Sequence, residues 1–115
     1  MLAGSALILA ACSGKAARAA ALRGNPDAGK VAIAAYGCGA CHTVPGIRDA
    51  RGLVGPPLDH FARRGFIAGQ LPNTFDNLVR WIESPQSVEP GTAMPDLGVP
   101  EPLARNIAAY LYTLQ

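Results

Sequence analysis

The chain has few aromatic side chains and no long apolar run. Phe, Trp and Tyr make up 6% of the 115 residues although half of the chain is apolar, so the side chains alone make a modest core. No run approaches the ~20 apolar residues of a membrane span. The formal net charge of +2 gives no electrostatic support for nucleic-acid binding. The length indicates a single domain.

Cysteine is also scarce, and two of the three cysteines lie in the stretch Cys38-Gly39-Ala40-Cys41-His42. A C-x-x-C-H sequence is typical of covalent haem attachment. Two thiols on one turn can both bond the vinyl groups of one porphyrin edge, and His42 then follows over the ring face as an iron ligand. A thioredoxin-like redox pair and half of a zinc site are the alternatives, but the sequence has neither a β-α-β pattern nor a second ligand pair. The motif predicts one covalently bound haem c.

The third cysteine, Cys12, lies in Leu9-Ala10-Ala11-Cys12, which resembles a bacterial lipobox. We expect residues 1–11 to be a signal sequence, Cys12 to be lipidated, residues 12–24 to form a tether and residues 25–115 to form the domain. This places the protein on the periplasmic side of a bacterial envelope, anchored to the membrane through Cys12. A plain cleavable signal is the alternative. Because no Lys or Arg precedes the apolar run, a start codon upstream of Met1 also stays open.

Helical signals dominate the remaining chain. Asn25 and Pro26 begin a helix that continues to Tyr36, and Asn73 or Thr74 caps the next, whose apolar residues run from Phe75 to Ile82. A last helix is expected from about Pro100 to Leu114. The connections are rich in Gly and Pro, and no alternation typical of strands is visible. The predicted fold class is all-α, with three main helices and long loops.

These features resemble the class I cytochrome c family over roughly residues 25–115. Gly55-Pro56-Pro57-Leu58 matches its G-P-x-L loop. The resemblance implies that the Pro56 carbonyl accepts the N–H of the proximal His42 and that Leu58 lies at the haem. It also implies that the Gly29/Ile33 face of the first helix crosses the Ile107/Tyr110 face of the last.

The same resemblance implies a second iron ligand. Met94 lies in a Pro/Gly-rich loop at the family's spacing from the helix-ending Pro85, and is expected to be the distal ligand. Thr92 matches a hydroxyl that reaches a haem propionate, and Trp81 falls where relatives carry an aromatic beside the Met. Arg63 and Arg64 are candidates for pairing with the propionates, the alternative being a solvated turn. We expect His60 to be a surface or hydrogen-bonded residue rather than a ligand.

The predicted function is one-electron transfer by a haem c with His42 and Met94 as ligands, within a bacterial respiratory chain. The expected partners are redox proteins such as a terminal oxidase, with the protein itself a monomeric carrier rather than an enzyme. Only Lys15 and Lys30 are present, so the Lys-rich docking face of mitochondrial cytochromes c is absent. The small bacterial members look more similar. The alternative is a haem-based ligand sensor or peroxidase-like enzyme with a labile Met ligand.

Overall fold

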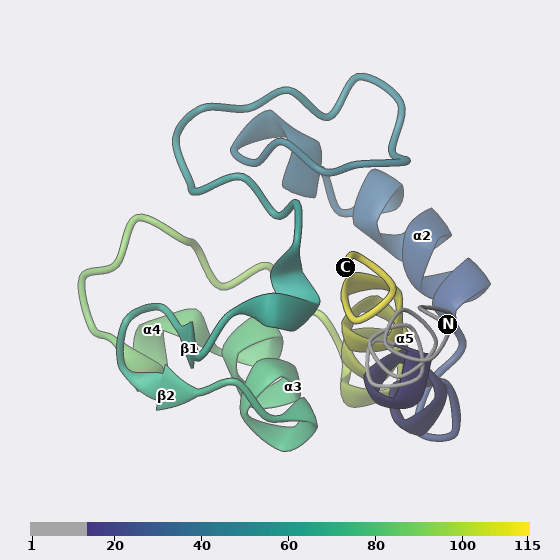
Figure 1. Ribbon diagram of the computed structural model, residues 1–115. Helices are drawn as coiled ribbons and strands as arrows, with labels where there is room; N and C mark the ends of the chain where they lie inside the picture. Colours follow the sequence, from purple (N-terminus) through teal and green to yellow (C-terminus); the bar gives the residue numbers. More distant parts are fainter. Residues whose placement is uncertain (1–13) are drawn as a thin grey trace, which may run out of the picture.

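The computed structural model describes residues 14–115 and is largely helical (Figure 1). A helical stretch at residues 14–21 comes first. The elements that follow it are α2 (Pro26–Ala35), the 3-10 helices η1 (Cys38–Ala40) and η2 (Phe61–Arg63), the strands β1 (Phe66–Ile67) and β2 (Leu71–Pro72), and the helices α3 (Phe75–Glu83), α4 (Pro85–Val88) and α5 (Glu101–Leu111). Within residues 14–115, no helix combines the length and the apolar character needed to cross a membrane.

The first predicted helix and the last cross at very short range, as expected. Gly29 of α2 lies directly against the Asn106 carbonyl of α5, where a Cβ atom would overlap that oxygen. Ile33 and Ile107 are buried in the same contact. The N–H of Asn25 donates to Asn106 Oδ1 at 2.9 Å, and Asn25 Oδ1 caps α2 by accepting from the Ala28 N–H at 3.0 Å. Because η1 follows α2 directly, the α2–α5 contact fixes the position of the turn that carries the two cysteines.

Helix α3 packs against the other side of α5. Of the two predicted caps it uses Thr74, whose Oγ1 accepts from the Asn77 N–H at 3.2 Å. Its buried residues Leu78, Val79 and Ile82 form the core with α5. The helix ends before Pro85, which cannot donate the next backbone hydrogen bond.

The described part of the predicted tether is folded onto the domain. Residues 14–21 are helical, and Ala20 is only 4% exposed, so this part of the segment packs against the domain. Arg23 pairs with Asp76, and its guanidinium lies 4.5 Å above the centre of the Phe75 ring. The predicted lipidation site, Cys12, lies outside the described residues.

Two further elements differ from the expected all-α fold with unbroken loops. Strands β1 and β2 form an antiparallel pair, with Phe66 opposite Pro72 and Ile67 opposite Leu71. Two-residue strands are too short to produce a visible alternation of apolar and polar residues. Helix α4 occupies the start of the segment that we expected to be loop, since Pro85 is well suited to a first helical position.

Candidate functional site

The turn that carries the two thiols is set by the end of α2. Gly37 has a positive φ of 71° and stops the helix, and η1 then brings both cysteines onto one tight turn. Within that turn the N–H groups of Cys41 and His42 both donate to the Cys38 carbonyl, at 3.2 and 3.0 Å. Cys38 and Cys41 are free thiols, not a disulfide. Burial raises the pKa of the Cys38 thiol, and Cys41 raises it further, although a backbone hydrogen bond acts in the opposite direction. Cys38 is therefore a neutral thiol at neutral pH.

The following loop wraps this turn through backbone contacts. The Gly52 N–H donates to the Gly39 carbonyl at 3.0 Å, and the Gly55 N–H donates to the Cys41 carbonyl at 2.7 Å. Gly55 also lies against the imidazole of His42, where an added Cβ would sit 2.7 Å from Nδ1 and 2.9 Å from Nε2. Any larger residue at this position would push the ring aside.

The His42 side chain makes the contact that the G-P-x-L resemblance implies. Its Nδ1 lies 2.7 Å from the Pro56 carbonyl oxygen. A carbonyl can only accept, so Nδ1 must carry the proton, and the lone pair of the ring is on Nε2. An imidazole held in this tautomer is the form that binds a metal ion. Leu58 completes the loop: its N–H donates to the Thr43 carbonyl at 2.8 Å, and its side chain packs on the core.

Met94 lies on the second long loop, half-buried. The amide of Gln86 holds this loop: Nε2 donates to the carbonyls of Thr92 and Met94 at 2.7 and 2.9 Å, and Oε1 accepts from the Gly91 N–H at 3.1 Å. Our sequence analysis missed Gln86. The only signal was a long polar side chain directly after the helix-ending Pro85.

The other predicted site residues differ in their burial and in the contacts they make. Trp81 is half-buried and packs on the core. The Thr92 hydroxyl accepts from the Met94 N–H at 3.4 Å, within its own loop. Arg64 donates to the Pro57 carbonyl and lies over the Phe61 ring, whereas Arg63 is exposed. A propionate partner for either arginine therefore stays a prediction.

His60 is an exposed, hydrogen-bonded residue, as expected. Its Nδ1 donates to the Gln115 carbonyl at 2.5 Å, and its Nε2 lies 3.8 Å from Asp59. Among the described residues, no group of three or more His, Cys, Asp and Glu side chains is placed to hold a metal ion.

Several large apolar side chains near these loops are uncovered. Leu53 and Val54, just before Gly55, are 89% and 70% exposed, and Leu97, just after the Met94 loop, is 42% exposed. Phe66 on β1 is 63% exposed. In Figure 1 the loop after η1 runs across the top of the view and the loop after α4 across the left, and both return to the centre. In chemical type these groups match what a haem c requires: two thiols, an imidazole with a lone pair on Nε2, a thioether, and exposed apolar side chains that could cover a planar group.

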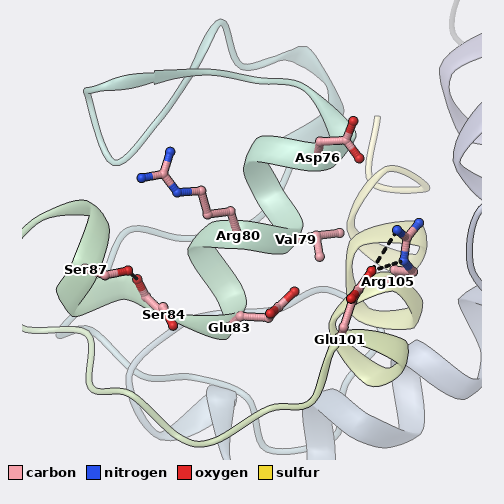
Figure 2. A pocket seen from close by; sticks show the side chains of 8 residues that line it. All are labelled: Asp76, Val79, Arg80, Glu83, Ser84, Ser87, Glu101 and Arg105. Carbon is pink, nitrogen blue, oxygen red and sulfur yellow. Dashed lines mark hydrogen bonds and ion pairs between the residues drawn. The ribbon is translucent and has the colours of Figure 1, made fainter.

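A separate hollow of about 380 Å³ lies between α3, α4 and α5 (Figure 2). Its lining is mainly charged and includes Asp76, Arg80 and Glu83. Glu101 and Arg105 on its α5 side pair with each other, with Arg105 Nε and one terminal nitrogen at 3.0 and 2.8 Å from Glu101 Oε1. None of the predicted site residues lines this hollow.

Comparison with known proteins gives a partial relationship. The chain is 43% identical over 58 residues to cytochrome c oxidase subunit 2 of Alkalihalophilus pseudofirmus, and 39% identical over 59 residues to cytochrome c oxidase subunit 2 of a Bacillus species (strain PS3). Each match covers 50% of this chain and 16% or 17% of the relative, so the chain spans about a sixth of the length of these curated relatives. No family model and no solved structure matches.

Proposed function

We propose that this chain binds one haem c through Cys38 and Cys41, with His42 and Met94 as iron ligands, and carries single electrons in a respiratory chain. The observation that carries the proposal is the 2.7 Å contact between His42 Nδ1 and the Pro56 carbonyl, directly after a C-x-x-C sequence with two free thiols. A histidine that only faces solvent does not need its tautomer fixed by a backbone carbonyl, whereas an iron ligand does.

Each part of the chain has a defined task in this proposal. The η1 turn presents two thiols from one rigid support, the α2–α5 crossing. The Pro56 carbonyl keeps the proton on Nδ1 and so leaves the Nε2 lone pair free, and Gly55 provides room for the ring in that orientation. The ligand is thus pre-organised, which keeps the rearrangement between two oxidation states small.

The Met94 loop supplies the second ligand, a neutral thioether. When bound, the haem supplies a one-electron couple, and imidazole-plus-thioether ligation favours its reduced state relative to two imidazoles. With His42 and Met94 both bound, the iron would have no open site for small molecules. The exposed side chains of Leu53, Val54 and Leu97 would be covered by an apolar ring, which would exclude water from the site.

The comparisons support a partner class for this proposal. Half of this chain matches cytochrome c oxidase subunit 2, and we propose that a respiratory oxidase takes part in the electron transfer. Attachment to the periplasmic side of a membrane through a lipidated Cys12 belongs to the same proposal. Mass spectrometry of the mature N-terminus tests it.

An optical spectrum of the oxidised protein tests the ligand assignment. We expect haem that acid acetone does not extract, together with the weak far-red band of sulfur-to-iron charge transfer. Met94→His should abolish that band while the haem stays attached. A colourless protein, or one in which both thiols react freely with alkylating reagents after expression with the haem-attachment machinery, would refute the proposal. Rapid uptake of carbon monoxide by the reduced protein at neutral pH would instead favour a ligand sensor.

A further inference from the structure

The geometry points to Gln86 as a positioning residue that decides how firmly Met94 is held as a ligand. This inference rests on the proposed function. The Gln86 side chain reaches across the loop and bonds to three backbone groups, those of Gly91, Thr92 and Met94. It uses both Nε2 hydrogens and one of the two lone pairs of Oε1, so all three hydrogen bonds that its amide makes go to the four residues that end in Met94.

Gln86 is itself held in place. It follows Pro85, which is among the most completely buried side chains of the described residues, and it lies in α4. Its backbone N–H donates to Asp96 Oδ1 at 3.1 Å. Gln86 therefore connects to the chain on both sides of Met94, through a side chain to residues 91–94 and through its backbone to Asp96. Helix α4, which Pro85 anchors in the core, thus fixes the position of the Met94 loop through Gln86.

The loop has little else to order it. The Thr92 N–H donates to the Glu89 carbonyl at 3.1 Å, and the Met94 N–H lies at 3.4 Å from Thr92 Oγ1, which is a weak contact. No other residue of the described chain donates a hydrogen bond to the Thr92 or Met94 carbonyl. Loss of the Gln86 donors would leave both carbonyls to water and free the backbone that aims the Met94 side chain.

The experiment measures how easily an added ligand displaces Met94. Imidazole is titrated into the oxidised haem-loaded protein while the far-red band is followed, for the wild type, Gln86→Glu and Gln86→Ala. Gln86→Glu keeps the shape of the side chain but replaces both donors with acceptors. Gln86→Glu loses the two donated hydrogen bonds, and Gln86→Ala loses these two and the bond from the Gly91 N–H. We expect the apparent Kd for imidazole to fall by about tenfold to a hundredfold in both variants.

Ser87→Ala is the matched control. Ser87 is the next residue of α4, and its hydroxyl donates to the Ser84 carbonyl at 2.9 Å, not to the loop (Figure 2). Its imidazole Kd should equal that of the wild type. Urea unfolding is measured alongside, because a residue that only supports the fold would lower stability and leave the imidazole Kd of the folded protein unchanged.

The outcomes separate the two proposals. A wild-type protein without the far-red band refutes the proposed function. A wild type with the band, combined with an unchanged imidazole Kd in Gln86→Glu and Gln86→Ala, overturns the role of Gln86 alone. If Gln86→Glu does not fold, Gln86→Ala decides in the same way, since it removes the donors without adding a charge.

Discussion

Replacing Gly29 with Ala tests the helix crossing that supports the site. In an ordinary helix, Gly→Ala is stabilising by up to about 1 kcal/mol, because Ala loses less backbone entropy on folding. Here the new Cβ would overlap the Asn106 carbonyl and lie 3.0 Å from the Ile107 nitrogen. Both are backbone atoms of α5, so no side chain can rotate away. The two helices would have to separate.

The size of the effect follows from what the separation disturbs. Ile33 and Ile107 are buried at the crossing, and shifts of this kind in a close-packed core cost about 1–3 kcal/mol. Because backbone atoms meet on both sides, we take the upper end of this range, about 3 kcal/mol. Subtracting the gain of about 1 kcal/mol in helix propensity leaves a net loss of about 2 kcal/mol in the free energy of unfolding. For a domain of this size, that lowers Tm by roughly 10 °C.

Urea denaturation of the wild type, Gly29→Ala and Gly65→Ala measures this loss in the free energy of unfolding. Gly65 is the matched control because an added Cβ there meets no atom within 4 Å. Gly65→Ala should therefore be neutral or stabilising by up to about 1 kcal/mol, through the entropy of the unfolded chain. If Gly29→Ala proves as stable as Gly65→Ala, the close approach of α2 and α5 is refuted.

Three more predictions concern the site, the core and the N-terminal segment. Gly55→Ala should displace the His42 ring and shift the haem reduction potential in a voltammetric titration, and an unchanged potential would contradict the packing described. Burial raises the pKa of Tyr112 to about 12, so the folded state holds the phenolic proton more tightly than the unfolded state, and stability should fall as the pH rises from 10 to 12. This loss, about 1–2 kcal/mol after allowance for solvent screening, should be absent in Tyr112→Phe when unfolding is followed across that range. Arg23→Ala removes an exposed ion pair and the contact with the Phe75 ring, and should lower the free energy of unfolding by about 1 kcal/mol, with Arg23→Lys losing less.

Local signals in the sequence were sufficient to predict where α2 and α3 begin. The Asn25-Pro26 start and Thr74 cap both act through side chains within three residues of the bonds they make, so they can be read without knowing the fold. The contact between His42 and Pro56 spans 14 residues and was reached through a motif, because the residues on both sides have recognisable identities.

The missed features have a common physical origin. Gln86 bonds to backbone carbonyls, which every residue has, so nothing at positions 92 and 94 indicates the contact. Ala20 is buried because a small side chain fits against the domain, and its sequence neighbourhood carries no apolar periodicity strong enough to show it. Such contacts depend on the shape of the finished fold rather than on local pattern.

The packing of α2 against α5 also affects the order in which the chain folds. The bond between Asn25 and Asn106 joins residues 81 positions apart, so the face of α2 around Gly29 can be covered by α5 only after the α5 segment has been synthesised. The η1 turn that carries Cys38 follows α2 directly, so it lacks the support of the α2–α5 contact until then. If haem is attached at Cys38 and Cys41 as proposed, attachment before α5 packs would act on a turn that the helix crossing does not yet support.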